Sequence, residues 1–197
     1  MNLPNKLTIL RVILIPVFLL FIYLECPYHY TIALFVFSAA SITDALDGHI
    51  ARTRGLVTDF GKFLDPLADK ALVMAALVVF VDIMPIFSAI PLIIIIAREF
   101  MVSGLRLVTA GKGVVVAAGF WGKLKTAFTL ASIILILLMM ALSEDFDWFG
   151  IAACHSQSFN DICRIIAQSV IWISAALTVI SGCVYLKGYW RYIDSKK

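Results

Sequence analysis

Long apolar segments separated by short polar stretches dominate this chain. Each segment approaches the roughly 20 residues that a helix needs to cross the hydrocarbon core of a bilayer. The segments cover positions 8–24, 29–51, 62–83, 86–108, 121–142 and 165–187. The pattern predicts an all-α integral membrane protein: a bundle of six transmembrane helices that forms a single domain over residues 1–197, without a separate soluble part.

Composition supports this class. Hydrophobic residues make up 62% of the chain and charged residues 15%, and the mean hydropathy is +0.99. These values exclude a water-soluble, monomeric globular protein. The net charge of +3 is too small to indicate a nucleic-acid partner, and basic residues at a membrane edge are explained by topology and anionic lipid.

Lysine and arginine positions predict the orientation. Six spans place both termini on one side of the membrane, and 14 of the 16 cations fall on that side. Cytoplasmic flanks of membrane helices are enriched in these residues. Both termini and segment 44–70 are therefore expected to face the cytoplasm.

The N-terminal residues predict a short interfacial helix that leads into the first span. Pro4, Asn5 and Thr8 precede that span, and Lys6 and Arg11 are expected on its polar side. For Asn5 and Thr8 the alternative role is helix capping.

Two stripes of acidic and small residues stand out beside the cytoplasmic surface. The stripe on the second predicted helix has the spacing i, i+3, i+4 and i+7 and comprises Asp44, Asp47, Gly48 and Ala51. The stripe on the third has the spacing i, i+4 and i+8 and comprises Gly61, Asp65 and Asp69. Each spacing places its members on one face of a helix. Because the connection between the helices is short, they are expected to be antiparallel neighbours with facing stripes.

Four converging carboxylates would repel one another unless they bind a cation. Hard oxygen ligands suit Mg²⁺ or Mn²⁺, and such a set could hold two ions roughly 3.5 to 4 Å apart, as in phosphoryl-transfer sites. The small residues Gly48, Ala51 and Gly61 would let a nucleotide diphosphate approach the backbone, and Arg52 adds a forked phosphate donor. The alternative is that the acids are merely solvated and the glycines serve helix packing.

These same residues carry a resemblance to a known family. The string Asp44-x2-Asp47-Gly48-x2-Ala51-Arg52-x8-Gly61-x3-Asp65-x3-Asp69 matches at all eight fixed positions the signature of the CDP-alcohol phosphotransferase family. Members of that family are six-helix membrane enzymes, commonly homodimers. They transfer a phosphatidyl or related phosphate group from a CDP-linked donor to an alcohol and release CMP.

The resemblance implies roles for individual residues. It implies that divalent metal is bound by Asp44, Asp47, Asp65 and Asp69, with Asp69 as the proton acceptor. It also implies a nucleotide and diphosphate site lined by Gly48, Ala51, Arg52, Thr58 and Gly61, with Asn5 and Thr8 beside the cytidine.

Similarity beyond the signature indicates the acceptor. NLPNKLTILRVILIP, FLDPLADK, AREFMVSGLRLV and GKLKTA, within residues 2–130, resemble the bacterial members that use CDP-diacylglycerol and glycerol 3-phosphate. The implied products are phosphatidylglycerophosphate and CMP, and the implied location is the bacterial cytoplasmic membrane.

A phosphate-bearing acceptor needs cations. Arg98 is predicted inside the fourth span, eight residues from Arg106, and a buried cation needs an anionic partner or a water-filled cavity. We expect Arg98 and Lys123 to bind the acceptor phosphate, with Lys62 and Arg106 as weaker candidates. The alternative is that these cations snorkel to lipid or pair with an acid such as Glu99.

Three questions stay open at this level. Within the family, a cardiolipin or phosphatidylinositol synthase would use the same metal site with another acceptor. A cation transporter could also place carboxylates between helices, although it predicts acids near the bilayer midplane. Cys154 and Cys163 could form a disulfide or remain thiols that pack as small hydrophobes.

Overall fold

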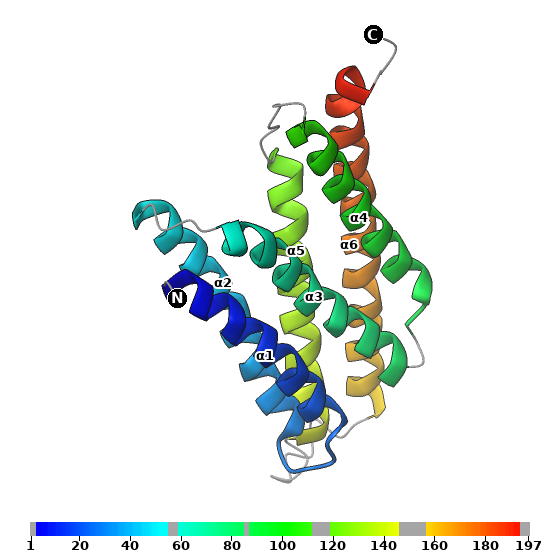
Figure 1. Ribbon diagram of the computed structural model, residues 1–197. Helices are drawn as coiled ribbons and strands as arrows, with labels where there is room; N and C mark the ends of the chain where they lie inside the picture. The colour runs from blue at the N-terminus through cyan, green and yellow to red at the C-terminus, as the bar shows by residue number, and fades with distance from the viewer. Residues whose placement is uncertain (1–2, 55–58, 85–86, 112–118, 146–156, 194–197) are drawn as a thin grey trace. The chain divides into compact units, whose positions relative to one another are not determined.

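The computed structural model describes residues 3–54, 59–84, 87–111, 119–145 and 157–193. Side chains are described throughout these ranges except at 3–6, 44–54, 59–66, 69, 107, 110–111, 157–159 and 189–193. Every element in these ranges is helical (Figure 1): α1 (Leu3–Tyr23), α2 (His29–Arg54), α3 (Asp59–Ile83), α4 (Ala89–Gly111), α5 (Phe120–Met140), the π-helical turn η1 (Ala141–Asp145) and α6 (Gln157–Ile193). Each predicted apolar segment coincides with one of the helices α1 to α6, which confirms the all-α class.

The expected short interfacial helix is continuous with the first span, and its place at the membrane surface stays a prediction. α1 is one helix from Leu3 to Tyr23, so no separate helix precedes it in the described residues. Pro4 lies in the first turn, where a missing N–H costs no intrahelical hydrogen bond. The helix then continues without a break to Tyr23.

The last helix is longer than hydropathy predicts. α6 begins at Gln157 and ends at Ile193, whereas the apolar segment covers only 165–187. Residues 157–164, which precede the sixth apolar segment, are helical as well, because hydropathy marks the apolar part of a helix and not its ends. Cys154 lies outside the described residues, so its pairing with Cys163 stays a prediction.

The chain folds into two compact units. Unit 1 comprises Met1–Met84 and Ile133–Arg164, and unit 2 comprises Pro85–Ser132 and Ile165–Lys197. In unit 1, α1 packs against both α2 and α3, as Figure 1 shows, and α2 also contacts η1. The rings of Phe18 and Phe37, both fully buried, meet at a centroid distance of 5.7 Å between α1 and α2.

Hydrogen bonds tie the ends of the helices of unit 1 together. The Tyr23 hydroxyl donates to Asp82 Oδ2 at 2.7 Å, which joins the end of α1 to the end of α3. Asp145 Oδ2 accepts from both the backbone N–H and the hydroxyl of Thr31, each at 2.6 Å. Since the first N–H groups of a helix have no partner within it, Asp145 of η1 caps α2 from outside that helix.

Asp145→Ala is expected to lower the free energy of unfolding by about 1–3 kcal/mol, because it leaves two donors of Thr31 without their buried acceptor. Thermal unfolding in detergent measures the change. The control is Asp161→Ala, which removes an exposed carboxylate 4.0 Å from Arg164 and is expected to cost about 0–1 kcal/mol. Equal melting temperatures for the two variants would contradict the capping role.

In unit 2, hydroxyl-bearing side chains form a polar stripe between α5 and α6. Thr129 Oγ1 and Ser174 Oγ lie 3.4 Å apart, and Thr178 donates to the Ser174 carbonyl oxygen at 2.7 Å. Small hydroxyl residues let helices approach closely and satisfy one another inside a membrane. The stripe continues at Ser181, which is also buried.

Large apolar side chains cover the outward faces of the helices. Phe35 is 71% exposed, Phe100 65% and Ile165 62%. Two described segments, Phe120–Asp145 and Asn160–Gly188, are long and apolar enough to cross a membrane. Apolar surface of this extent is unfavourable in water, and together with the hydropathy it indicates a membrane protein.

Candidate active site

The backbone is helical at the positions of both acidic stripes. α2 is helical through Arg54 and α3 from Asp59 onward, so positions 44, 47, 48 and 51 lie along one face of α2, and positions 61, 65 and 69 lie along one face of α3. The side chains of Arg52, Lys62 and the four aspartates lie outside the described ones, and Thr58 lies outside the described residues. The facing of the two stripes therefore stays a prediction.

The described side chains include no group of three or more His, Cys, Asp or Glu residues that could hold a metal ion. The donor set implied by the sequence consists of four aspartates on two neighbouring helices of unit 1. In chemical terms these hard oxygen donors fit Mg²⁺ or Mn²⁺.

The N-terminal helix buries two polar residues that precede the acidic helices in sequence. Thr8 is buried, and Arg11, one turn later, is 0% exposed. Arg11, which the sequence placed on the polar side of the N-terminal helix, is therefore enclosed by protein. α1 is flanked by α2 and α3, and this packing encloses a face that the sequence alone places at the membrane surface. The side chain of Asn5 is outside the described ones.

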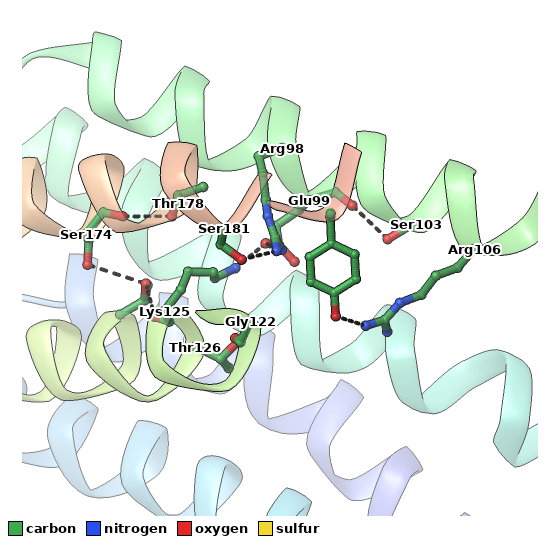
Figure 2. Close-up of polar contacts among 12 residues, drawn as sticks. Arg98, Glu99, Ser103, Arg106, Gly122, Lys125, Thr126, Ser174, Thr178 and Ser181 are labelled. Carbon is green, nitrogen blue, oxygen red and sulfur yellow. Dashed lines mark hydrogen bonds and ion pairs between the residues drawn. The ribbon is translucent and has the colours of Figure 1, made fainter. Parts of the chain in front are cut away.

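Unit 2 contains a cluster of charged residues around Arg98, which Figure 2 shows. Arg98 Nη1 donates to Glu99 Oε1 at 2.9 Å, and its Nη2 donates to Ser181 Oγ at 2.6 Å. Lys125 Nζ donates to the same Glu99 oxygen. One carboxylate oxygen thus accepts from two cations that come from α4 and α5.

A second arginine joins the cluster through Tyr185. Arg106 Nη2 donates to the Tyr185 hydroxyl at 2.8 Å. With Arg98, Lys125 and Arg106 against the single carboxylate of Glu99, these four side chains carry a net charge of +2. Positive groups gathered in this way can bind an anion.

The two lysines at the start of α5 differ in burial. Lys123 is exposed, whereas Lys125 is 5% exposed and bonded to Glu99. Residues two apart on a helix point roughly 200° away from each other, so only one of them can face the cluster. Sequence reasoning chose Lys123 and missed Lys125 and Tyr185; the buried hydroxyl stripe on α5 and α6 was the signal that could have located the inward face.

A cavity of about 450 Å³ lies elsewhere, in unit 1. Its lining includes Glu25, Tyr28, His29, Glu144 and Asp145. The described lining of this cavity includes no site residue that the sequence implies.

Comparison with known proteins decides the family. The model of the CDP-alcohol phosphatidyltransferase family matches residues 1–180. The chain belongs to this family.

Within the CDP-alcohol phosphatidyltransferases, close relatives match over nearly their full length. A Bacillus subtilis (strain 168) protein named CDP-diacylglycerol–glycerol-3-phosphate 3-phosphatidyltransferase is 38% identical over 98% of this chain and 98% of its own length. A Rickettsia bellii (strain RML369-C) protein of the same name is 40% identical over 97% of each chain. The family implies a transferase that acts on a CDP-linked donor, as the signature predicted.

Proposed function

We propose that this chain is a phosphatidylglycerophosphate synthase, which transfers the phosphatidyl group of CDP-diacylglycerol to glycerol 3-phosphate and releases CMP. The observation that carries the proposal is the near-full-length similarity to relatives named for this reaction, combined with the complete acidic signature on α2 and α3.

The proposed reaction uses Asp69 as the base. The acceptor hydroxyl oxygen attacks the phosphorus that bears diacylglycerol, its proton passes to Asp69, and the bond from that phosphorus to the bridging oxygen of CMP breaks. Asp44, Asp47, Asp65 and Asp69 would hold Mg²⁺ or Mn²⁺, which when bound polarises the diphosphate and stabilises the departing phosphate. General-base assistance of this kind contributes roughly 10²–10⁴ in rate.

The donor nucleotide is assigned to residues of unit 1. Gly48, Ala51 and Gly61 would allow the diphosphate to approach the backbone, and Arg52 would donate to its oxygens. Thr58, Asn5 and Thr8 complete the proposed site.

The acceptor phosphate is assigned to the cations of unit 2. Arg98 is the principal ligand, because its guanidinium is already oriented by Glu99 and Ser181. Arg106 remains a proposed ligand, and the buried Lys125 takes the place of Lys123, which is exposed and points away from the cluster. Lys62, whose side chain is outside the described ones, stays a weaker candidate.

For the whole chain we propose six transmembrane spans in the cytoplasmic membrane, with both termini and the acidic segment on the cytoplasmic side. The cation distribution and the six apolar helices support this topology. We also propose that both units act as one catalytic domain, which the family match over residues 1–180 supports, and that the enzyme is a homodimer.

The direct test supplies purified protein with CDP-diacylglycerol, Mg²⁺ or Mn²⁺ and a panel of alcohols. The expected result is CMP release with glycerol 3-phosphate and a phosphatidylglycerophosphate product identified by mass spectrometry. If the protein preferred inositol or phosphatidylglycerol, that alcohol would be the acceptor in place of glycerol 3-phosphate. Cation flux into proteoliposomes without CMP release would indicate a transporter instead.

Arg98→Ala is expected to raise the apparent KM for glycerol 3-phosphate roughly 10- to 100-fold, the loss expected for a charged hydrogen bond to phosphate. The KM for CDP-diacylglycerol should change little. Steady-state CMP release at varied acceptor concentration measures both values. Arg164→Ala, which removes an exposed arginine of unit 1, is the control, and an unchanged acceptor KM in Arg98→Ala would remove Arg98 from the site.

A further inference from the structure

Tyr185 of α6 contacts both arginines of the charged cluster. Its ring centroid lies 5.3 Å from Arg98 Cζ and 5.5 Å from Arg106 Cζ, and its hydroxyl accepts the hydrogen bond from Arg106 at 2.8 Å. The side chain is 6% exposed. Nothing in the family signature includes this position.

Two arginines of like charge share Tyr185 as a contact. They are eight residues apart on α4, which is about 12 Å along a helix at about 1.5 Å per residue, and their charges repel. The face of an aromatic ring attracts a guanidinium within about 6 Å of its centroid. Both guanidinium groups thus contact Tyr185 of α6; Figure 2 labels Arg98 and Arg106.

The position of the ring is fixed by neighbouring helices. A Cβ atom added to Gly122 of α5 would lie 3.2 Å from both the hydroxyl oxygen and Cε2 of Tyr185, so the missing side chain at this position leaves the space that the ring occupies. On α4, Val102 packs with Tyr185 in a hydrophobic cluster that Met101 and Leu105 extend. Residues of α4 and α5 thus determine where the hydroxyl of Tyr185 lies.

The dependence of the two arginines on Tyr185 differs. Arg98 is also bonded to Glu99 and Ser181, so its position has other supports. For Arg106 the described side-chain hydrogen bond goes to the Tyr185 hydroxyl. Removing this hydroxyl should therefore affect Arg106 first.

We propose that Tyr185 is a positioning residue for the acceptor phosphate: its ring and hydroxyl hold Arg98 and Arg106 in the arrangement that binds the phosphate dianion of glycerol 3-phosphate. This inference rests on the proposed function and deepens it. Tyr185 acts through the arginines and is not itself a phosphate ligand.

The test compares Tyr185→Phe with Tyr185→Leu in the CMP-release assay. Tyr185→Phe keeps the ring and loses one hydrogen bond, so the KM for glycerol 3-phosphate should rise roughly 2- to 10-fold. Tyr185→Leu also loses the ring face, and the rise should reach roughly 10- to 100-fold. In both variants kcat and the KM for CDP-diacylglycerol should stay close to the wild-type values.

A double variant separates positioning from a general packing role. If the hydroxyl acts through Arg106, Tyr185→Phe should raise the acceptor KM in the wild-type background but add nothing to Arg106→Ala. Additive effects of the two substitutions would overturn the inference. Tyr185→Phe preserves almost the whole side-chain volume, so this comparison stands even if Tyr185→Leu fails to fold.

Gly122→Ala tests the position of the Tyr185 ring from the α5 side. The added methyl group should displace the Tyr185 ring and raise the acceptor KM in the same direction, without altering any cation. Tyr30→Phe, at a buried tyrosine of unit 1, is the matched control and should leave both KM values unchanged.

Two outcomes would overturn the inference in distinguishable ways. If the wild-type protein converts glycerol 3-phosphate and the Tyr185 variants keep its acceptor KM, or lose kcat and both KM values together with thermal stability, the positioning role alone is refuted. If the wild-type protein releases no CMP with glycerol 3-phosphate, the proposed function fails and the inference falls with it.

Discussion

Asp69→Asn is expected to lower kcat roughly 10²–10⁴-fold, the usual contribution of a positioned general base. The amide has nearly the same shape as the carboxylate but cannot accept the proton of the attacking hydroxyl. Because an amide oxygen can still contact a cation, part of the CDP-dependent divalent-metal binding should survive. Single-turnover CMP release measures the chemical step, and Mn²⁺ titration in the presence of CDP measures the binding.

The control for this experiment lies on the same helix. Asp82 stands at the other end of α3, where it accepts a hydrogen bond from Tyr23, and Asp82→Asn should leave kcat unchanged. Wild-type turnover in Asp69→Asn would show that another group takes the proton. Loss of metal binding equal to the loss of rate would make Asp69 a ligand only.

Asp44→Ala and Asp65→Ala are expected to abolish activity and to remove its dependence on divalent metal. Each substitution deletes one hard oxygen ligand, the first from α2 and the second from α3. If the two helices share the cations, as we propose, either loss should weaken Mn²⁺ binding to a similar degree. Mn²⁺ titration of each variant, together with CMP release over a range of Mg²⁺ concentrations, tests whether the two substitutions weaken metal binding to a similar degree.

Asp161→Ala removes an exposed carboxylate of unit 1 and serves as the control for loss of negative charge. It should retain both activity and the metal requirement. If Asp44→Ala weakened metal binding while Asp65→Ala left it unchanged, the cations would belong to α2 alone and the shared site would be refuted.

Hydropathy located the helices well but described their ends and faces poorly. The six apolar segments coincide with α1 to α6, because a run of roughly 20 apolar residues has no other stable form in a bilayer. At residues 157–164 and 3–8 the helix continues through polar residues. The free energy of helix formation there does not depend on hydropathy, so the pattern could not show it.

The two parts of the candidate site also differ in how far the sequence could predict them. The acidic signature is local, since all of its positions lie within two consecutive helices, so its residue types and spacing are visible in the sequence; that the two stripes face each other stays a prediction. The charged cluster of unit 2 joins α4, α5 and α6 over more than 80 residues of sequence. From the sequence, Glu99 was considered only as an acid that could pair with the cations. No pattern near Tyr185 indicated that this residue contacts the arginines.

By itself, the sequence determined the helical membrane class, the positions of the apolar helices, the family and the eight signature positions, because each depends on residue type and spacing along one or two adjacent helices. Only the tertiary structure decided that Arg11 is buried, that Lys125 and not Lys123 faces the interior, and that Tyr185 contacts both arginines. Which face of a helix is enclosed depends on the neighbours that pack against it, and those neighbours are distant in the sequence.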